Sequence, residues 1–280
     1  EVPSIIGRDY NYLNYVVSDS LLYIFLINRK LQTLLTIKTD SLLIKRIRDF
    51  RILLANPSQS ENARTKFNNY QQIGYELYQT LIEPVSKYFI SNKLLISPDN
   101  ILSYLPFETF VSSRYEGEDI LYRKLNYLMN DYSISYAYSV TFMKELINRK
   151  YKNSKNLIAF APVYTNAITI DSLFANRQGN GILYDLPYAR QEAEYVSGIS
   201  GGNLYLNDEA REIVFKTEAS KYNIIHLAMH TYLNDHNPMN SAMIFAQNNN
   251  APEDGLLYTY EVYGIPLNAR MVVLSSCNTG

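Results

Sequence analysis

Several residue types are scarce in this chain of 280 residues, and each scarcity excludes a class of protein. The single cysteine, Cys277, excludes an internal disulfide framework and a cysteine-rich structural zinc site. The 11 glycines and 10 prolines are too few for a collagen-like, linker-like or low-complexity chain. The longest apolar run, residues 21–27, is far shorter than the roughly 20 residues that a membrane helix needs, so no membrane association is expected.

Neither sign of charge is in excess, because 26 lysines and arginines stand against 27 acidic residues. This balance gives no electrostatic reason to expect nucleic acid or an anionic membrane as a partner. Hydrophobic residues make up 47% of the chain and charged residues 19%, a composition that can build a substantial core. We therefore expect a cytoplasmic protein of one or two domains.

The first forty residues predict a β-meander. Residues 12–17, 21–27 and 31–37 are short apolar, β-branched or aromatic runs, and the turn residues Ser18-Asp19 and Asn28-Arg29 separate them. Two helical periods follow. The first covers residues 42–54, and the second covers residues 61–84. We predict that residues 1–90 form a β-meander plus a helical pair packed on a sheet domain.

From residue 91 onward, strand-like and helix-like segments alternate. Short buried strands are predicted at residues 93–96, 157–161, 223–228 and 271–274, extended segments at 122–128 and 132–136, and helices at 140–147, 188–196 and 209–219. This alternation favours a mostly parallel sheet with helices on both faces. Residues 91–280 are therefore predicted to form one α/β domain.

Two of the predicted strands are followed by side chains suited to nucleophilic catalysis. In open parallel sheets, ligands bind beyond the carboxyl ends of the strands. His230 follows the strand at 223–228, and Cys277 follows the strand at 271–274. A right-handed crossover would bring both strand ends to the same edge of the sheet, where an imidazolium could stabilise a thiolate. The alternative interpretation is that Cys277 is an inert buried thiol.

A second histidine, His226, is expected to have a supporting role and not to act as the base. His226 and His230 are four residues apart, a spacing that could bind zinc on a helix. The segment is predicted to be a strand, however, which would separate the two rings by about 13 Å, and it lacks the glutamate of a metalloprotease motif. We therefore expect no metal and no cofactor, and we expect His226 to be a buried residue that supports the site.

Six spaced motifs occur in a fixed order along the chain. They read YELYQTLIEP at residues 75–84, ISPDNILSYLPFE at 96–108, LPYARQE at 186–192, NIIHLAMH at 223–230, DGLL at 254–257 and MVVLSSCNTG at 271–280. Together they resemble the CHAT domain family, caspase-like peptidases that are related to caspases and separases and often follow tetratricopeptide repeats. The interval between His230 and Cys277 agrees with the spacing in caspases, where the histidine precedes the cysteine by about 50 residues.

The resemblance implies a fold, a chemistry and partners. The fold would be a caspase-like three-layer sandwich with a mostly parallel central sheet, preceded by the β-meander and helical pair and lacking the C-terminal part of the family domain. The activity would be that of a cysteine endopeptidase, with His230 as general acid and base and Cys277 as nucleophile. The backbone N–H groups of Thr231 and Cys277 would form the oxyanion hole. The partners would be a protein or peptide substrate and an upstream tetratricopeptide-repeat or sensor domain.

Two departures from the family pattern keep other functions open. Thr231 stands where relatives usually have glycine, and the part of the family domain that follows the cysteine is expected to be missing. Both features favour a non-catalytic docking or signalling module as the alternative, and another thiol acyl-transfer enzyme would share the same dyad. Ser275 stands where basic-specific caspase relatives often carry an acid, so the sequence predicts no preference for the residue preceding the cleaved bond.

Overall fold

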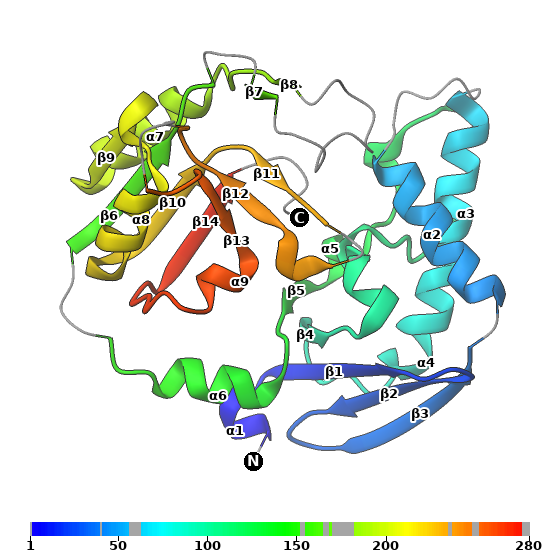
Figure 1. Ribbon diagram of the computed structural model, residues 1–280. Coiled ribbons are helices and arrows are strands. Elements are labelled where there is room, and N and C mark those ends of the chain that lie inside the picture. The colour runs from blue at the N-terminus through cyan, green and yellow to red at the C-terminus, as the bar shows by residue number, and fades with distance from the viewer. Residues whose placement is uncertain are drawn as a thin grey trace. The chain divides into compact units, whose positions relative to one another are not determined.

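The computed structural model describes residues 2–39, 41–55, 63–151, 155–164, 168–169, 182–234, 237–247 and 252–275 (Figure 1). The chain divides into two compact units, Glu1–Arg149 (unit 1) and Lys150–Gly280 (unit 2). The sequence places a division near residue 90 instead. Strand β4 (Lys93–Ser97) lies beyond that residue but pairs with β1 (Tyr10–Val17) inside unit 1.

Unit 1 is built on a sheet with the strand order β3-β2-β1-β4-β5. The remaining strands of this sheet are β2 (Leu21–Ile27), β3 (Gln32–Lys38) and β5 (Ser133–Tyr136). The helices and 3-10 turns are α1 (Val2–Ile6), α2 (Ser41–Ala55), α3 (Ala63–Leu81), α4 (Glu83–Ser86), η1 (Asn100–Tyr104), η2 (Phe107–Thr109), η3 (Tyr122–Lys124), α5 (Leu128–Asp131) and α6 (Val140–Asn148). Strands β1, β2 and β3 pair antiparallel, whereas β1, β4 and β5 run parallel.

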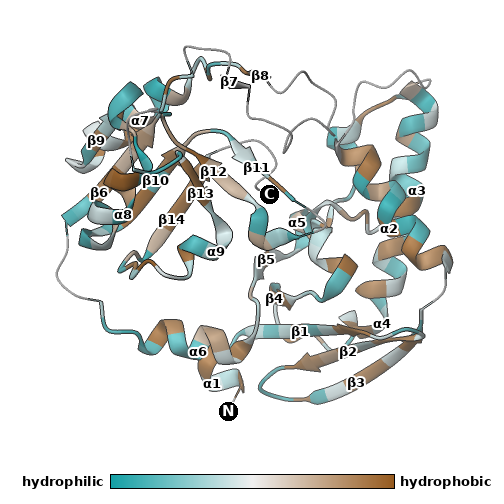
Figure 2. Ribbon diagram, in the orientation of Figure 1, coloured by the Kyte–Doolittle hydropathy of each residue, from teal (hydrophilic) through white to brown (hydrophobic). Residues whose placement is uncertain are grey.

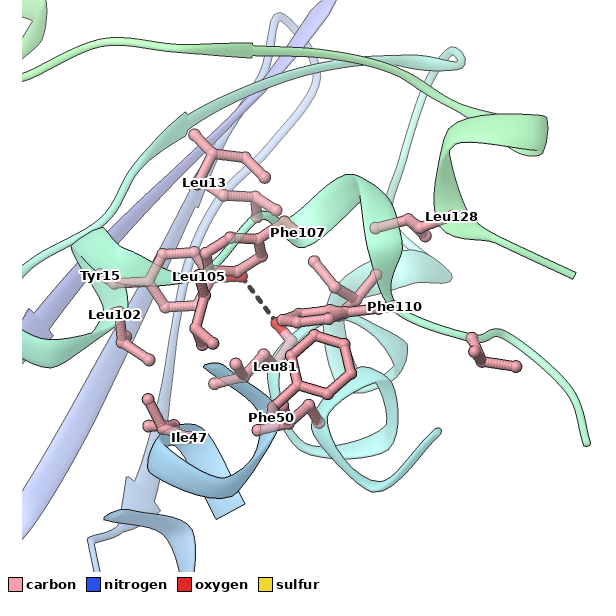
Figure 3. Packing of buried hydrophobic residues seen from close by; sticks show 14 of the residues in the cluster. Leu13, Tyr15, Ile47, Phe50, Leu81, Leu102, Leu105, Phe107, Phe110 and Leu128 are labelled. Atoms are coloured by element: carbon pink, nitrogen blue, oxygen red, sulfur yellow. Dashed lines mark hydrogen bonds between the residues drawn. The ribbon is translucent and has the colours of Figure 1, made fainter. Parts of the chain in front are cut away.

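One large apolar core fills the space between this sheet and the helices α2 and α3 (Figure 3). Alternate residues of the strands point inward, as the period of a half-buried strand requires, so that Leu13 and Tyr15 of β1 reach the core. Phe50 of α2 and Phe107 of η2 meet them there without solvent exposure. The Tyr15 hydroxyl is satisfied by donating to the Leu81 carbonyl, 2.8 Å away. A smaller cluster contains Tyr12 of β1 and Leu95 of β4, together with residues of α1 and α6. The neighbours of Tyr12 and Leu95 along the two strands belong to the large core instead.

Unit 2 contains a parallel sheet with the strand order β14-β10-β6-β9. Its strands are β6 (Lys155–Ala161), β9 (Asn203–Leu206), β10 (Tyr222–Ala228) and β14 (Met271–Ser275). Two smaller sheets comprise β11 (Thr231–Tyr232), β12 (Ala242–Ile244) and β13 (Leu256–Tyr258), and β7 (Ile168–Thr169) with β8 (Ile182–Leu183). The helices and 3-10 turns are α7 (Ala189–Ser200), η4 (Asn207–Glu209), α8 (Glu212–Glu218), η5 (Ala219–Lys221), η6 (Pro238–Asn240) and α9 (Thr259–Val262).

The parallel sheet of unit 2 is buried on both faces where β6 and β10 form its centre. Small side chains such as Ala159 and Ala228 face one side, where Ala189 and Ala193 let helix α7 approach closely. The alternate residues face a second cluster, which includes Phe215 of α8. Because both faces are covered, these strands need the continuous apolar runs that the sequence shows, as is typical of parallel sheets.

Two predictions about individual segments are wrong. Residues 122–128 were expected to be extended, but they include the 3-10 turn η3 and the first residue of α5. Strand β14 forms where predicted but is not buried, because Met271, Val272 and Leu274 are 50%, 46% and 43% exposed. Within the described residues it is an edge strand, and Figure 2 shows its hydrophobic colouring. No helix within the described residues combines the length and apolar character needed to cross a membrane.

Candidate active site

The carboxyl ends of β10 and β14 lie at matching positions in the sheet of unit 2. The two strands are parallel, and Ala228 at the end of β10 is the register partner of Ser275 at the end of β14. The buried Met229 follows Ala228, and the half-buried His230 comes next. Cys277 is two residues beyond Ser275 in the sequence, but it lies outside the described residues.

The imidazole ring of His230 is held by a backbone carbonyl. Its Nε2 atom lies 2.7 Å from the carbonyl oxygen of Tyr184, which follows β8. A carbonyl oxygen can only accept a hydrogen bond, so this contact requires a proton on Nε2. In the neutral ring, Nδ1 is therefore the nitrogen that can accept a proton. After protonation, Nε2–H still donates to the Tyr184 carbonyl, so this hydrogen bond is kept when the ring is positive. This arrangement suits a general base that acts through Nδ1.

Tyr164, which follows β6, contacts His230 through both its hydroxyl and its ring. The hydroxyl oxygen accepts a hydrogen bond from the backbone N–H of His230 at 3.1 Å. The two ring centroids are 4.8 Å apart. Burial raises the pKa of Tyr164 far above its usual value, so the phenol stays neutral at any pH at which the protein would work.

His226, which was expected to be a buried residue that supports the site, is buried against helix α7. Its side chain is buried on β10, and its Nε2 atom lies 2.9 Å from a carboxylate oxygen of Glu192 on helix α7. The distance is that of an ion pair, which forms when the imidazole is protonated, but the two groups do not make a hydrogen bond. The structure thus brings His226 to α7, where its contact serves the packing of that helix on the sheet.

Thr231, the expected oxyanion donor, begins the short strand β11. It pairs with Met243 of β12 in an antiparallel ladder, and the neighbouring N–H of Ile244 donates to the His230 carbonyl at 2.9 Å. The chain therefore turns from the parallel sheet into a second small sheet directly after His230. This change of partner fixes the backbone on both sides of the histidine.

A cluster of acidic groups elsewhere in unit 2 could hold a cation. Glu212, Glu253 and Glu261 place carboxylate oxygens within 4.8 Å of one another. Lys216 already supplies a positive charge there, because its Nζ atom lies 2.6, 2.9 and 2.8 Å from these three carboxylates in turn. Their hydrogen bonds and charges raise the pKa of Lys216 against the opposing effect of its desolvation. We therefore interpret the cluster as an ion-pair network that links α8 to the segment ending in α9.

Two contributors to this site could not be identified from the sequence. Tyr164 is one of 26 tyrosines, and only its place just after a buried strand distinguishes it. Tyr184 contributes a backbone carbonyl, which every residue possesses, so no sequence signal exists for it. His230 was found because a histidine that follows a buried parallel strand is chemically conspicuous.

Comparison with known proteins supports one family. The family model described as the CHAT domain matches residues 71–280, three quarters of the chain and parts of both units. A search of curated proteins gives no match. The matched range includes β10, His230 and the segment that carries Cys277.

Proposed function

Because the chain belongs to the CHAT domain family, a caspase-like peptidase-related family, we propose that it is a cysteine endopeptidase in which His230 and Cys277 form the catalytic dyad. The observation that carries this proposal is the parallel register of β10 and β14. Ala228 and Ser275 are partners, and the two reactive residues each come two positions later. Equivalent positions beyond neighbouring parallel strands share one edge of a sheet, which is where such folds place their ligands.

The orientation of the His230 ring supports the first step. With Nε2 bonded to the Tyr184 carbonyl, Nδ1 removes the thiol proton of Cys277. The sulfur attacks the carbonyl carbon of the substrate peptide, a carbon–sulfur bond forms, and the carbonyl electron pair moves to the oxygen. The backbone N–H groups of Thr231 and Cys277 would stabilise that oxyanion.

The second half of the reaction returns the proton. As the tetrahedral intermediate collapses, the carbon–nitrogen bond breaks and the imidazolium donates its Nδ1 proton to the leaving amine. Water then attacks the thioester and gives one proton to Nδ1. The carbon–sulfur bond breaks, the carboxylic acid product leaves, and the proton on the imidazolium returns to the sulfur.

The proposal extends to the fold and the partners. A caspase-like three-layer sandwich is supported by the parallel sheet of unit 2, whose opposite faces pack against α7 and α8. The substrate would be a protein or peptide in an extended conformation across the strand ends. An upstream tetratricopeptide-repeat or sensor domain would control access to it, as the family association suggests.

A peptide-library assay tests the activity. Wild type, Cys277→Ala and His230→Ala would be incubated with a mixed peptide library, and new termini would be counted by mass spectrometry. We expect wild type to cut selected sequences, and each variant to lose at least about 100-fold in rate, the lower end of the range for a general acid–base group. The matched control is Ser97→Ala, which removes a hydroxyl at the end of the parallel strand β4 in unit 1 and should leave cleavage intact.

The result that would contradict the proposal is equal cleavage by wild type and both dyad variants. Absence of cleavage by wild type across the library would also contradict it. In that case, retained binding to a protein partner would favour the docking or signalling module instead.

A further inference from the structure

Tyr164 and Ile244 together enclose the backbone of His230 in a closed set of hydrogen bonds. The His230 N–H donates to the Tyr164 hydroxyl at 3.1 Å, and that hydroxyl donates to the Ile244 carbonyl at 2.6 Å. The Ile244 N–H then donates back to the His230 carbonyl at 2.9 Å. Both backbone groups of the histidine are therefore fixed by one pair of residues.

The Tyr164–Ile244 part of this network is buried. Tyr164 is 4% exposed and Ile244 is fully buried, and Leu183, Tyr232 and Leu256 pack against them. In such surroundings a hydrogen bond is hard to replace, because solvent cannot take over the role of a missing partner. The phenol is also rigid, so its hydroxyl is a fixed acceptor for the backbone N–H of His230.

The same tyrosine faces the reactive ring. Its centroid is 4.8 Å from that of the imidazole, with an angle of 55° between the planes. An aromatic ring at this distance restricts how the imidazole can rotate. Among the described residues, the titratable groups next to Tyr164 are His230 itself, Tyr232 of β11 and Asp185, whose negative charge acts on the Tyr164 phenol.

We infer that Tyr164 is a positioning residue that sets the orientation of His230, so that Nε2 meets the Tyr184 carbonyl and Nδ1 stays available. The inference rests on the proposed function, and it deepens that function by assigning a determinant of the geometry of the base. Tyr164 acts through His230 and does not itself exchange protons with the substrate. Without the Tyr164 hydroxyl, the His230 N–H would lose its partner, and the ring would occupy more than one orientation.

The test compares Tyr164→Phe and Tyr164→Leu with wild type. Tyr164→Phe keeps the ring and removes only the hydroxyl, whereas Tyr164→Leu removes both. The matched control is Tyr222→Phe, because Tyr222 is a buried tyrosine at the opposite end of β10 that accepts a hydrogen bond from Lys155. This control separates the loss of a buried hydroxyl in the same sheet from the loss of the hydroxyl that holds His230.

The first readout does not depend on activity. In a Cys277→Ala background, the ¹⁵N chemical shifts of the His230 ring at alkaline pH report which nitrogen carries the proton. We expect the background protein and the Tyr222→Phe control to show the Nε2–H form. Tyr164→Phe should show a mixture of the two forms, and Tyr164→Leu a larger share of the Nδ1–H form.

The second readout is the kinetics of the active protein. A small displacement of a catalytic group can cost up to about 100-fold in rate, so we expect Tyr164→Phe to lower kcat by about 10- to 100-fold with KM changed less than about twofold. Unchanged ¹⁵N shifts in both Tyr164 variants would overturn the inference. So would a loss of kcat in Tyr222→Phe equal to that in Tyr164→Phe. A protein without peptidase activity would contradict the proposed function alone, because the NMR comparison would still decide the role of Tyr164.

Discussion

Both units contain parallel strands, but they use the carboxyl ends of those strands differently. In unit 1, the polar groups at the carboxyl ends of β1 and β4 are bonded to other groups of the protein. The N–H of Val17 donates to Asp99 at 2.8 Å, and Ser97 is bonded both to the Tyr12 hydroxyl and to the Ala137 carbonyl. In unit 2, the corresponding edge carries His230, whose backbone N–H and Nε2 are bonded, so that Nδ1 is the nitrogen that accepts a proton in the neutral ring.

This contrast shows that the topology of a parallel sheet identifies the edge where a site can form, whereas the side chains at that edge determine whether a site is present. The two sheets also differ in what stabilises them. Unit 1 has one large aromatic core on the inner face of its sheet, whereas unit 2 has two smaller apolar layers, an ion-pair network and an exposed edge strand. Substitutions in the core of unit 1, in the ion-pair network and on the edge strand should therefore lower stability by decreasing amounts.

The largest loss of stability should come from the core of unit 1. Phe107 is fully buried and its ring centroid lies 5.4 Å from that of Tyr15 and 5.0 Å from that of Phe110. Phe107→Ala should lower the free energy of unfolding by about 3–5 kcal/mol, because it removes these contacts and leaves a cavity. Denaturant unfolding followed by circular dichroism measures this. The control Phe142→Ala, at an exposed position of α6, should change little, and equal losses in both variants would contradict a single dominant core.

A smaller loss is expected from the ion-pair network of unit 2. Lys216→Met leaves the buried Glu212 without its counter-charge and should cost about 3 kcal/mol at pH 7. The pKa of Lys216 is raised in the folded state, so its contribution is complete below the ordinary lysine pKa of 10.5 and is lost only as the pH rises through the raised value. The difference from wild type should therefore be the same at pH 7 and pH 9.

The surface lysine of a nearby pair provides the control for that experiment. Lys221 pairs with Glu218 at an exposed position, so Lys221→Met should unfold at the same denaturant concentration as wild type. A Lys216→Met penalty that shrinks markedly by pH 9 would show that the lysine is not held by its three carboxylates.

The smallest effect is expected on the exposed edge strand. Val272 of β14 is the register partner of Ile225 of β10, so the two positions form a matched pair on neighbouring strands. Val272→Thr keeps the β-branched shape at an exposed position and should cost less than about 0.5 kcal/mol. Ile225→Thr places a hydroxyl in a fully buried position and should cost about 2 kcal/mol or more. Similar costs at both positions would mean that β14 is buried in solution.

The sequence predicted local structure well where hydrophobic patterns are long and continuous. The apolar runs that became β6 and β10 and the helical stripes that became α3 and α7 were all located within a few residues. Strands such as β9 and β11 were missed because segments of four and two residues carry little periodic signal. The pairing of β1 with β4 was also missed, because nothing within a strand specifies a parallel partner so distant in sequence.

The candidate site was predictable only in its side-chain chemistry. His230 and Cys277 could be singled out because few residue types supply a base and a nucleophile, and both follow predicted strands. The hydrogen bonds that orient His230 come from a tyrosine hydroxyl and a backbone carbonyl, which depend on how three distant segments pack. The pairing of Cys277 with His230 remains a prediction, because Cys277 lies outside the described residues.

The reactivity of the single cysteine tests the central claim most directly. Because Cys277 is the only thiol in the sequence, the rate of alkylation by iodoacetamide reports on this residue alone. A neighbouring imidazolium keeps a thiol ionised below neutral pH, so wild type should be alkylated at pH 6 at least about tenfold faster than His230→Gln, with the two rates converging by pH 10. Equal alkylation rates for wild type and His230→Gln across this pH range would contradict the dyad.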